Sequence, residues 1–186
     1  MSLPIMTNFN IITSFCRNGG IGRNGYIPWN ISTTYDTIFK RVTRGNGNNA
    51  VLMGSNTYDN RMITTHTPFA GRSNLVLSRN ENYTDQNPYR HVEYLSSIEN
   101  VLSHCKESNY DEVWIIGGES VYREFLTKPI VPIKNILLNY IDKGYRCDKF
   151  FPMKFVHNNN IETLTIAKEA SYMEYVMKVD YDKYPI

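Results

Sequence analysis

The chain has 186 residues, of which 41% are hydrophobic and 20% are charged, and its formal net charge is +2. This length suits one domain with a sizeable core, and the near balance of charge gives no basic stripe of the kind that nucleic acids require. Binding to DNA is therefore not expected. The sequence also has no run of 18 apolar residues that could span a membrane, so an association with lipid is not expected either.

Short β-rich runs alternate with amphipathic stretches along the chain, a pattern typical of a mostly parallel sheet flanked by helices. The predicted strands are residues 9–15, 50–54, 74–78, 91–95, 112–117 and 135–141, and then 162–168 and 172–181, which we expect to form an antiparallel hairpin. The predicted helices are residues 34–42, 55–61, 97–106 and 120–127. Ser96 and Glu99 have capping-box spacing at the start of the third helix. The sequence therefore predicts a single α/β domain over residues 1–186, with about eight strands and four helices.

The cysteines and the N-terminus carry no extracellular signature. Cys16, Cys105 and Cys147 are odd in number and far apart, so they fit neither a disulfide framework nor the spacing of zinc ligands. A reducing, cytoplasmic setting is the simplest interpretation. Residues 1–7 lack the features of a secretion signal and are expected to form a loose extension. The four histidines are dispersed, and no metal site is expected.

Two glycine-bearing segments indicate a nucleotide site: NGGIGRNGYIPW at residues 18–29 and DEVWIIGGESVY at residues 111–122. The first leaves a predicted strand through a tightly turning loop. In the second, Gly117 and Gly118 let the backbone come close to a ligand. The helix that follows offers unpaired N–H groups to an anion such as pyrophosphate.

One misleading pattern lies in the first segment. Gly20, Gly22 and Gly25 spell GxGxxG, the dinucleotide-binding fingerprint of a strand–helix–strand unit. That fingerprint must open a helix, whereas Pro28 and Trp29 follow within four residues here. The interpretation as such a fingerprint is therefore rejected.

In combination, the two segments resemble dihydrofolate reductase. Further motifs follow in the order of that family: a helix with Phe39 and Thr43, then VLMGSNTY at 51–58, TPFAGRSNLVLSRN at 67–80 and RCDKFFP at 146–152. The resemblance covers residues 9–152, and the C-terminal hairpin matches in pattern only. It implies an oxidoreductase that passes hydride from NADPH to dihydrofolate, giving tetrahydrofolate for one-carbon metabolism and thymidylate synthesis.

The resemblance makes the loop 18–29 a lid over the nicotinamide, with Ile27, Pro28 and Trp29 as its apolar inner face. A plain connection, with Trp29 in the core, is the other interpretation. The protein must also exclude water and help a proton reach the ring nitrogen beside the carbon that accepts hydride.

Several positions match the binding residues of the family. Arg72, in AGRSN, matches the arginine that grips the glutamate carboxylate of folate. The other substrate-binding positions are Ile12, Phe39, Ile116, Tyr122 and Asn139, and the apolar ones among them fit ordinary core packing equally well. The cofactor-binding positions are Ser14, Ile21, Gly54, Ser55, Asn56, Thr57, Ser78, Arg79, Gly117, Gly118, Glu119, Ser120 and Val121.

The pocket carboxylate of the family is displaced in this sequence. Family members carry Asp or Glu six residues after the lid tryptophan, and here that position holds Tyr35, whose phenol is uncharged at neutral pH. Asp36, one step along the helix, is the second candidate for the catalytic role, because both positions border the pterin pocket in the family. Thr33 and Asp36 also have capping-box spacing, so a structural role for Asp36 stays open. We expect turnover that is weaker than with the carboxylate in place.

The sequence leaves alternatives open for the identity of the cofactor and for the reaction. The position after Gly54 usually holds a basic contact to the 2′-phosphate of NADPH, but here it is Ser55. Ser78 and Arg79 keep one cation, so NADPH is preferred over NADH. Two other functions stay open: a reductase for another pterin or a pyrimidine, and a non-catalytic protein that binds folate or nucleotide. The resemblance also implies a fused or associated thymidylate synthase as a candidate partner.

Overall fold

A central β-sheet organises the described part of the chain, which is residues 7–30, 33–83, 89–128, 130–158, 163–168 and 177–178 of a computed structural model. The strands are β1 (Asn8–Cys16), β2 (Gly20–Gly22), β3 (Asn49–Gly54), β4 (Ser73–Leu77), β5 (Val92–Leu95), β6 (Glu112–Gly117), β7 (Ile133–Ile141), β8 (Lys149–Phe150), β9 (Thr163–Lys168) and β10 (Met177–Lys178). The helices are α1 (Thr33–Arg44), α2 (Ser55–Thr65), α3 (Ile98–Ser108) and α4 (Glu119–Thr127), with a short 3₁₀ helix η1 (Met153–Asn158).

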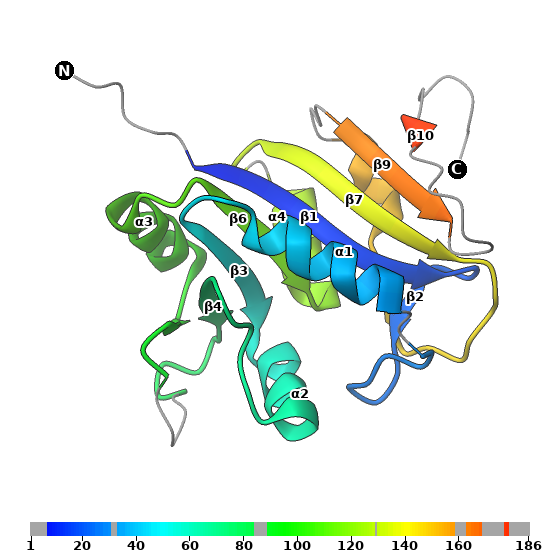
Figure 1. Ribbon diagram of the computed structural model, residues 1–186, viewed down its shortest axis with the longest axis horizontal. Coiled ribbons are helices and arrows are strands. Elements are labelled where there is room, and N and C mark those ends of the chain that lie inside the picture. Colours follow the sequence, from blue (N-terminus) through cyan, green and yellow to red (C-terminus); the bar gives the residue numbers. More distant parts are fainter. Residues whose placement is uncertain are drawn as a thin grey trace.

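The central sheet has the strand order β10-β9-β7-β1-β6-β3-β4-β5, and its strands run side by side in Figure 1. Every pairing from β9 to β5 is parallel, and only β10 is antiparallel to its neighbour β9. The ends of β3 and β6 therefore lie at one edge of the sheet, where the chains of α/β proteins usually form ligand sites.

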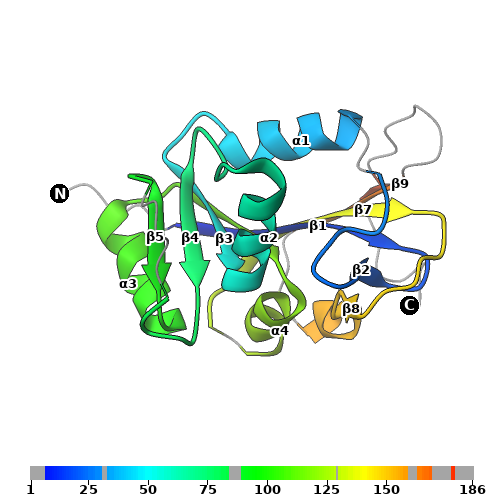
Figure 2. The ribbon, with the colours of Figure 1, turned by 90° about the horizontal axis from the view of Figure 1, so that it is seen from below.

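Both faces of the sheet are covered, which explains why its central strands are almost continuously apolar. Adjacent side chains of β1 point to opposite faces: Ile11 joins the core cluster that includes Phe125 of α4, and Ile12 joins the cluster that includes Tyr58 of α2. Both isoleucines are buried. Figure 2 shows α1 above the sheet and α4 below it.

The structure confirms the predicted α/β class, the mostly parallel sheet and the four helices, with ends that differ by a few residues. Of the predicted strand 172–181, only residues 177–178 are described. The sequence did not predict the second sheet, in which β2 pairs with β8 through Gly20 and Phe150. That pairing joins segments far apart in the chain, so no local sequence pattern predicts it.

The predicted cap of the third helix was wrong by one residue. Ser97, not Ser96, has the extended backbone of an N-cap, and its side chain accepts a hydrogen bond from the N–H of Asn100. Hydrogen bonds from its own backbone and from Ser97 lower the pKa of the Glu99 carboxyl. Ser96 Oγ instead accepts a bond from the Asn100 side chain. Because Ser96 and Ser97 are adjacent, capping-box spacing alone identified the wrong serine as the N-cap.

The three cysteines are free thiols. Although Cys16 and Cys147 are far apart in the sequence, their sulfur atoms lie 3.8 Å apart. No group of three or more His, Cys, Asp or Glu side chains within the described ranges is placed to hold a metal ion. None of the helices described here is long and apolar enough to cross a membrane.

Candidate active site

Two helices begin side by side without the usual side-chain cap. Gly54 is the N-cap of α2 and Gly118 is the N-cap of α4, and neither helix has a side-chain capping bond. A Cβ atom on Gly118 would lie 3.4 Å from Thr57 Oγ1, and one on Gly54 would lie 3.3 Å from Val121 Cγ2, so the two helix starts are in contact. Helix N-termini present free N–H groups and partial positive charge. Together they are suited to a dianionic pyrophosphate.

The glycine pair at the end of β6 brings the backbone against an aromatic floor. Gly117 has φ of 114°, a conformation that favours glycine, and its Cβ would lie 3.1 Å from the ring of Tyr122. The peptide bond between Gly117 and Gly118 is cis. A side chain at position 117 would therefore have to displace the tyrosine.

Tyr122 is fixed by hydrogen bonds beneath this glycine pair. It is buried, and its hydroxyl donates to the carbonyl of Ile12 over 3.0 Å and is also hydrogen bonded to Thr13. Burial raises the pKa of the phenol above its ordinary value, and the nearby charge of an ionised Tyr35 would raise it further. Tyr122 therefore stays a neutral hydroxyl at physiological pH, and Tyr35 lies on its side of the site.

Asp36 forms an ion pair within its own helix. Its carboxylate accepts a 2.5 Å hydrogen bond from Lys40 one helical turn later, and its side chain is 46% exposed. Its charge acts on the arginines Arg61 and Arg72, whose pKa values it raises against the effect of burial. The two candidates for the missing acid thus make different contacts: the Tyr35 ring packs toward Phe39, and the Asp36 carboxylate binds Lys40.

A row of aromatic rings leads from Tyr35 to Arg72. The ring centroids of Tyr35 and Phe39 are 6.4 Å apart, and those of Phe39 and Phe69 are 5.5 Å apart. The guanidinium carbon of Arg72 lies 5.7 Å from the Phe39 ring and 5.4 Å from the Phe69 ring. The row therefore runs from Tyr35 to Arg72.

Arg72 is buried, with 7% of its surface exposed, yet not all of its hydrogen-bond donors have a partner. One Nη donates to the carbonyl of Ala70, while the buried Nε has no partner. Burial, and then the charges of Arg44 and Arg61, lower the pKa of Arg72 to about 10, so it remains a cation at neutral pH. A buried guanidinium with a free donor is suited to a carboxylate ligand.

Sequence reasoning missed Asn74, which shapes the turn before Arg72. Its buried side chain accepts a hydrogen bond from the N–H of Phe69 and donates to the carbonyls of Phe69 and Arg72. The motif AGRSN contained this residue, and an Asn that hydrogen bonds neighbouring backbone is a known way to hold a turn.

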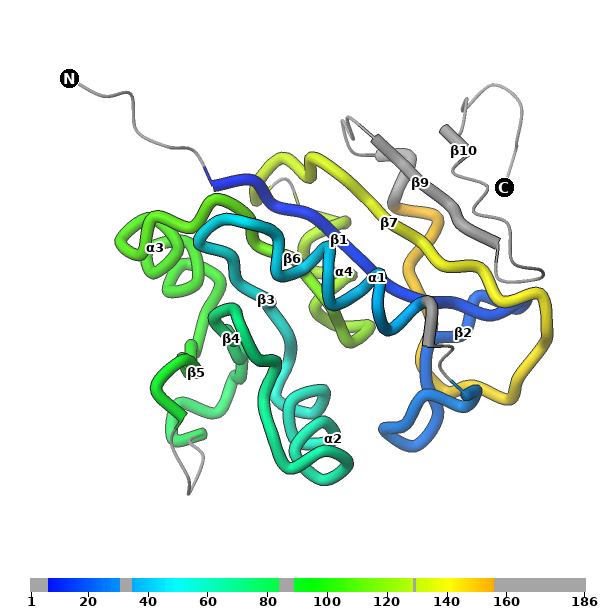
Figure 3. Tube along the Cα trace, in the orientation of Figure 1, coloured from blue at the N-terminus to red at the C-terminus, as the bar shows by residue number. Residues whose placement is uncertain are grey.

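The predicted lid, residues 18–29, is fastened to the segment that carries β8 (Figure 3). Asp148 accepts a hydrogen bond from the N–H of Asn24 and donates its own N–H to Gly22. Trp29 is buried against the ring of Tyr145, whereas Ile27 is 48% exposed. Trp29 thus packs in a small core of its own. Whether the loop closes over a ligand stays a prediction.

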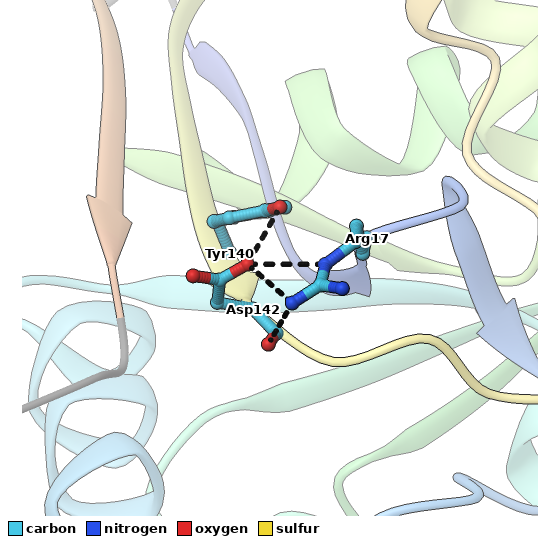
Figure 4. A network of polar contacts seen from close by, with 3 residues as sticks. All are labelled: Arg17, Tyr140 and Asp142. Atoms are coloured by element: carbon cyan, nitrogen blue, oxygen red, sulfur yellow. Dashed lines mark hydrogen bonds and ion pairs between the residues drawn. The ribbon is translucent and has the colours of Figure 1, made fainter.

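An ion pair ties the start of this loop to β7 (Figure 4). Arg17 follows β1, and its guanidinium contacts the side chain of Asp142 over 3.1 Å and the carbonyl of Asp142 over 2.9 Å. Tyr140 donates to the same carboxylate. These bonds raise the pKa of Arg17. The β1 end of the loop is therefore anchored at a defined point.

The remaining predicted substrate positions lie near the central strands. Ile116 is partly buried in the cluster that contains Ile12, which is ordinary core packing. Asn139 stands opposite Ser14 in the β1–β7 pairing, and its amide donates to Ser14 Oγ over 3.1 Å. Both polar side chains thus sit at the ends of adjacent strands. Their proposed ligand contacts stay predictions.

The predicted nucleotide positions divide into two groups. Ser55, Asn56, Ser120 and Glu119 belong to the first turns of α2 and α4, and Glu119 accepts from the N–H of Phe150 and so links α4 to β8. Ser78 and Arg79 follow β4, and Ser78 lines a cavity of about 100 Å³. Ile21 is partly buried against the core. The cavity is lined by Ser78, Asn80, Glu81, Tyr83, Tyr94, Leu95, Ser96 and Asn100.

Comparisons with known proteins agree on one family. A family model described as dihydrofolate reductase matches residues 8–181. The chain is 31% identical to dihydrofolate reductase of Heliothis virescens over 77% of its own length and 78% of that protein, and 31% identical to that of Drosophila melanogaster over 79% and 80%. It is 30% identical to bifunctional dihydrofolate reductase-thymidylate synthase 2 of Arabidopsis thaliana, over 82% of this chain and 27% of that protein.

Proposed function

The chain belongs to the dihydrofolate reductase family, and from that membership we propose that it reduces 7,8-dihydrofolate to 5,6,7,8-tetrahydrofolate with NADPH as the donor. The observation that carries the proposal is the row of rings that leads from Tyr35 to the buried Arg72. Its two ends match a heterocycle that needs a flat floor and a tail that carries a carboxylate.

The residues at the helix starts fit a dinucleotide. The free N–H groups of the first helical turns after Gly54 and Gly118 would hold the pyrophosphate of NADPH. When bound, NADPH supplies the hydride. Arg79 is the proposed cation for the 2′-phosphate, while Glu81 beside the same cavity opposes a second negative charge. With one cation and one carboxylate here, the expected preference for NADPH over NADH is small.

The chain's own side chains would orient the substrate and exclude water. Arg72 would hold the glutamate carboxylate through paired N–H donors. Asn139, hydrogen bonded to Ser14, would offer its amide to the polar edge of the pterin. The lid, held by Asp148, would cover the reacting face.

Proton delivery is the step in which this chain departs from its relatives. We propose that Tyr35 positions the water that protonates the substrate, since it stands at the position of the family carboxylate and its ring begins the row that leads to Arg72. Asp36 would act only at a distance, because Lys40 binds its carboxylate. We expect Tyr35→Phe to lower kcat with dihydrofolate more than Asp36→Asn does. A larger loss in Asp36→Asn, measured by NADPH oxidation, would assign the role to the carboxylate.

The same departure supports a second candidate function. Without a charge at position 35, the pocket holds the amino and ring N–H donors of a pterin less firmly. A related reductase for another pterin or a pyrimidine would tolerate that change. Turnover rates with dihydrofolate and with each alternative heterocycle, at equal NADPH, separate the two: the proposal requires dihydrofolate to be the better substrate.

We also propose a thymidylate synthase, fused or separate, as a partner of this chain. The support is that some relatives are named as bifunctional enzymes. The mass of the protein purified from its own cells distinguishes a fused partner from a separate one.

A further inference from the structure

Two of the three thiols lie together at the base of the predicted lid. Cys16 ends β1 and Cys147 precedes β8, and although 131 positions separate them in the chain, their sulfur atoms are 3.8 Å apart. A disulfide bond holds its sulfur atoms at about 2 Å. A small approach of the two side chains would therefore let a covalent bond form between them.

The first strand of the lid passes directly over this pair of thiols. A Cβ atom built on Gly20, in β2, would lie 2.3 Å from Cys147 Sγ and 3.2 Å from Cys16 Sγ. A side chain at position 20 would therefore push Cys147 aside, whereas glycine lets the backbone of the lid cover both sulfurs. The backbone of Gly22 is also hydrogen bonded to Cys147. The thiol pair and β2 thus pack against each other.

Neighbouring residues connect both thiols to further parts of the lid. The S–H of Cys16 donates to Asn18 Oδ1 over 2.7 Å, and Asn18 is the first residue of the lid. Cys147 directly precedes Asp148, whose carboxylate accepts a hydrogen bond from the N–H of Asn24 over 2.9 Å. A chemical change at the two sulfurs therefore acts on the start of the lid and on the turn at its tip.

The two thiols differ in their access to solvent. Cys16 is buried, whereas Cys147 is partly exposed, so an oxidant in solution reaches Cys147 first. Burial, and then the neighbouring Cys16, raise the pKa of the Cys147 thiol to about 11. Because the thiolate is the reactive form of cysteine, oxidation at neutral pH requires sustained exposure to the oxidant. In a reducing setting the two thiols therefore stay reduced.

We propose that Cys16 and Cys147 are a redox-sensitive modification site, which hydrogen peroxide converts to a disulfide that restrains the lid. The Cys147 thiolate attacks one oxygen of the peroxide, the O–O bond breaks, and a sulfenic acid forms with release of one water molecule. The sulfur of Cys16 then attacks the sulfenic sulfur, and the hydroxyl group leaves with the Cys16 proton as a second water molecule. The two thiols are oxidised by two electrons, and the peroxide is reduced.

The disulfide should favour the arrangement in which β2 stays paired with β8 (Figure 2). Once the end of β1 is bonded to the segment that carries β8, the two sides that enclose Gly20 can no longer separate. A cross-link of this kind restricts open states more than the closed one. The expected effect on turnover rests on the proposed function: kcat should fall, because ligands enter and leave when the lid opens. Formation of the disulfide does not depend on that function.

The test follows opening of the lid by trypsin cleavage of the purified protein, before and after treatment with hydrogen peroxide. Arg23 is exposed in the lid, and Arg90, exposed in the turn before β5, is the reference site. After oxidation we expect cleavage after Arg23 to be about threefold slower relative to cleavage after Arg90. Mass spectrometry should find Cys16 joined to Cys147, and dithiothreitol should reverse both changes.

Matched variants assign the response to this pair of thiols. Cys147→Ser keeps the size of the side chain and removes the disulfide, so peroxide should leave the relative cleavage after Arg23 unchanged. Cys16→Ser is a second variant with the same expected result. Cys105→Ala is the control, since it removes the thiol that is buried in the separate core cluster, and it should keep the full response. Melting temperatures of the reduced proteins show whether each variant is folded.

The outcomes separate this inference from the proposed function. Absence of a disulfide between Cys16 and Cys147 after peroxide treatment would overturn the inference. An unchanged relative cleavage after Arg23 in the oxidised protein would overturn it as well, and so would equal slowing in Cys147→Ser. If the reduced protein does not turn over dihydrofolate, the proposed function fails, while the disulfide and the protection of Arg23 are still measured.

Discussion

The two ends of the candidate site are built from different parts of the chain. The end suited to pyrophosphate is made from backbone, namely the uncapped starts of α2 and α4 at Gly54 and Gly118. The end suited to the substrate tail is made from side chains, above all the buried Arg72. Backbone sites depend on glycine and helix placement, whereas side-chain sites change with single substitutions. Substitutions at the two ends should therefore act on different ligands.

The largest effect should come from the side-chain end. Replacing Arg72 by Met removes the buried charge, and we expect the KM for dihydrofolate to rise by about a hundredfold while the KM for NADPH stays within about twofold. Arg41→Met, at an exposed position of α1, is the control. Initial rates over a range of both ligands measure this. If both KM values rose together, the two ends would not be separable.

A change at the backbone end should act on the other ligand. The backbone of Gly118 has negative φ and its Cβ would meet only Thr57 Oγ1 at 3.4 Å, so Gly118→Ala can be accommodated. The added methyl group would obstruct close approach of the pyrophosphate. We expect the KM for NADPH to rise by about tenfold, with little change for dihydrofolate.

Gly117→Ala offers a contrast to that variant. Because Gly117 has positive φ and its Cβ would press on Tyr122, we expect a loss of about 1–3 kcal/mol in the free energy of unfolding. Urea unfolding of both variants measures the difference. Equal stability of the two alanine variants would contradict the distinction drawn between the two glycines.

A substitution that loosens the lid should have a smaller effect, and it should act on kcat and not on the binding of either ligand. Asp148→Ala removes the acceptor for the N–H of Asn24. We expect kcat to fall by about threefold, with both KM values nearly unchanged, because the loop would spend less time in place over the reacting groups. Presteady-state rates of NADPH oxidation would detect the change. An unaltered kcat would mean that this bond does not position the loop.

Changes at the N-cap of α3 should have the smallest effect on activity. Ser97→Ala should lower the free energy of unfolding by about 1 kcal/mol and leave kcat and both KM values as they are. Ser96→Ala should cost less, because Ser96 does not cap the helix. A larger loss in Ser96→Ala would restore the capping assignment made from spacing alone.

The sequence predicted those features that leave a local pattern. Alternating and continuous apolar runs located the strands, and the glycines at 117 and 118 located the start of α4. It did not predict the pairing of β2 with β8, which depends on residues far apart in the chain. The contact between the sulfurs of Cys16 and Cys147 was also missed, since 131 positions separate these residues in the chain.

The two candidates for the missing acid show the same limit. Spacing placed Tyr35 and Asp36 next to each other and left both open. In the folded chain, adjacent helical positions differ by about 100° in direction. The Tyr35 ring accordingly packs toward Phe39, whereas the Asp36 carboxylate binds Lys40. Which side of a helix faces a ligand depends on tertiary packing, and short sequence motifs do not contain that information.

The rate of NADPH oxidation by the purified protein, with and without dihydrofolate, tests the proposed reaction most directly. We expect oxidation that requires both ligands, yields tetrahydrofolate in equal amount and is lost in Arg72→Met at low substrate concentration. Binding of NADPH without any oxidation in the presence of dihydrofolate would contradict the assignment of this chain as a reductase for that substrate.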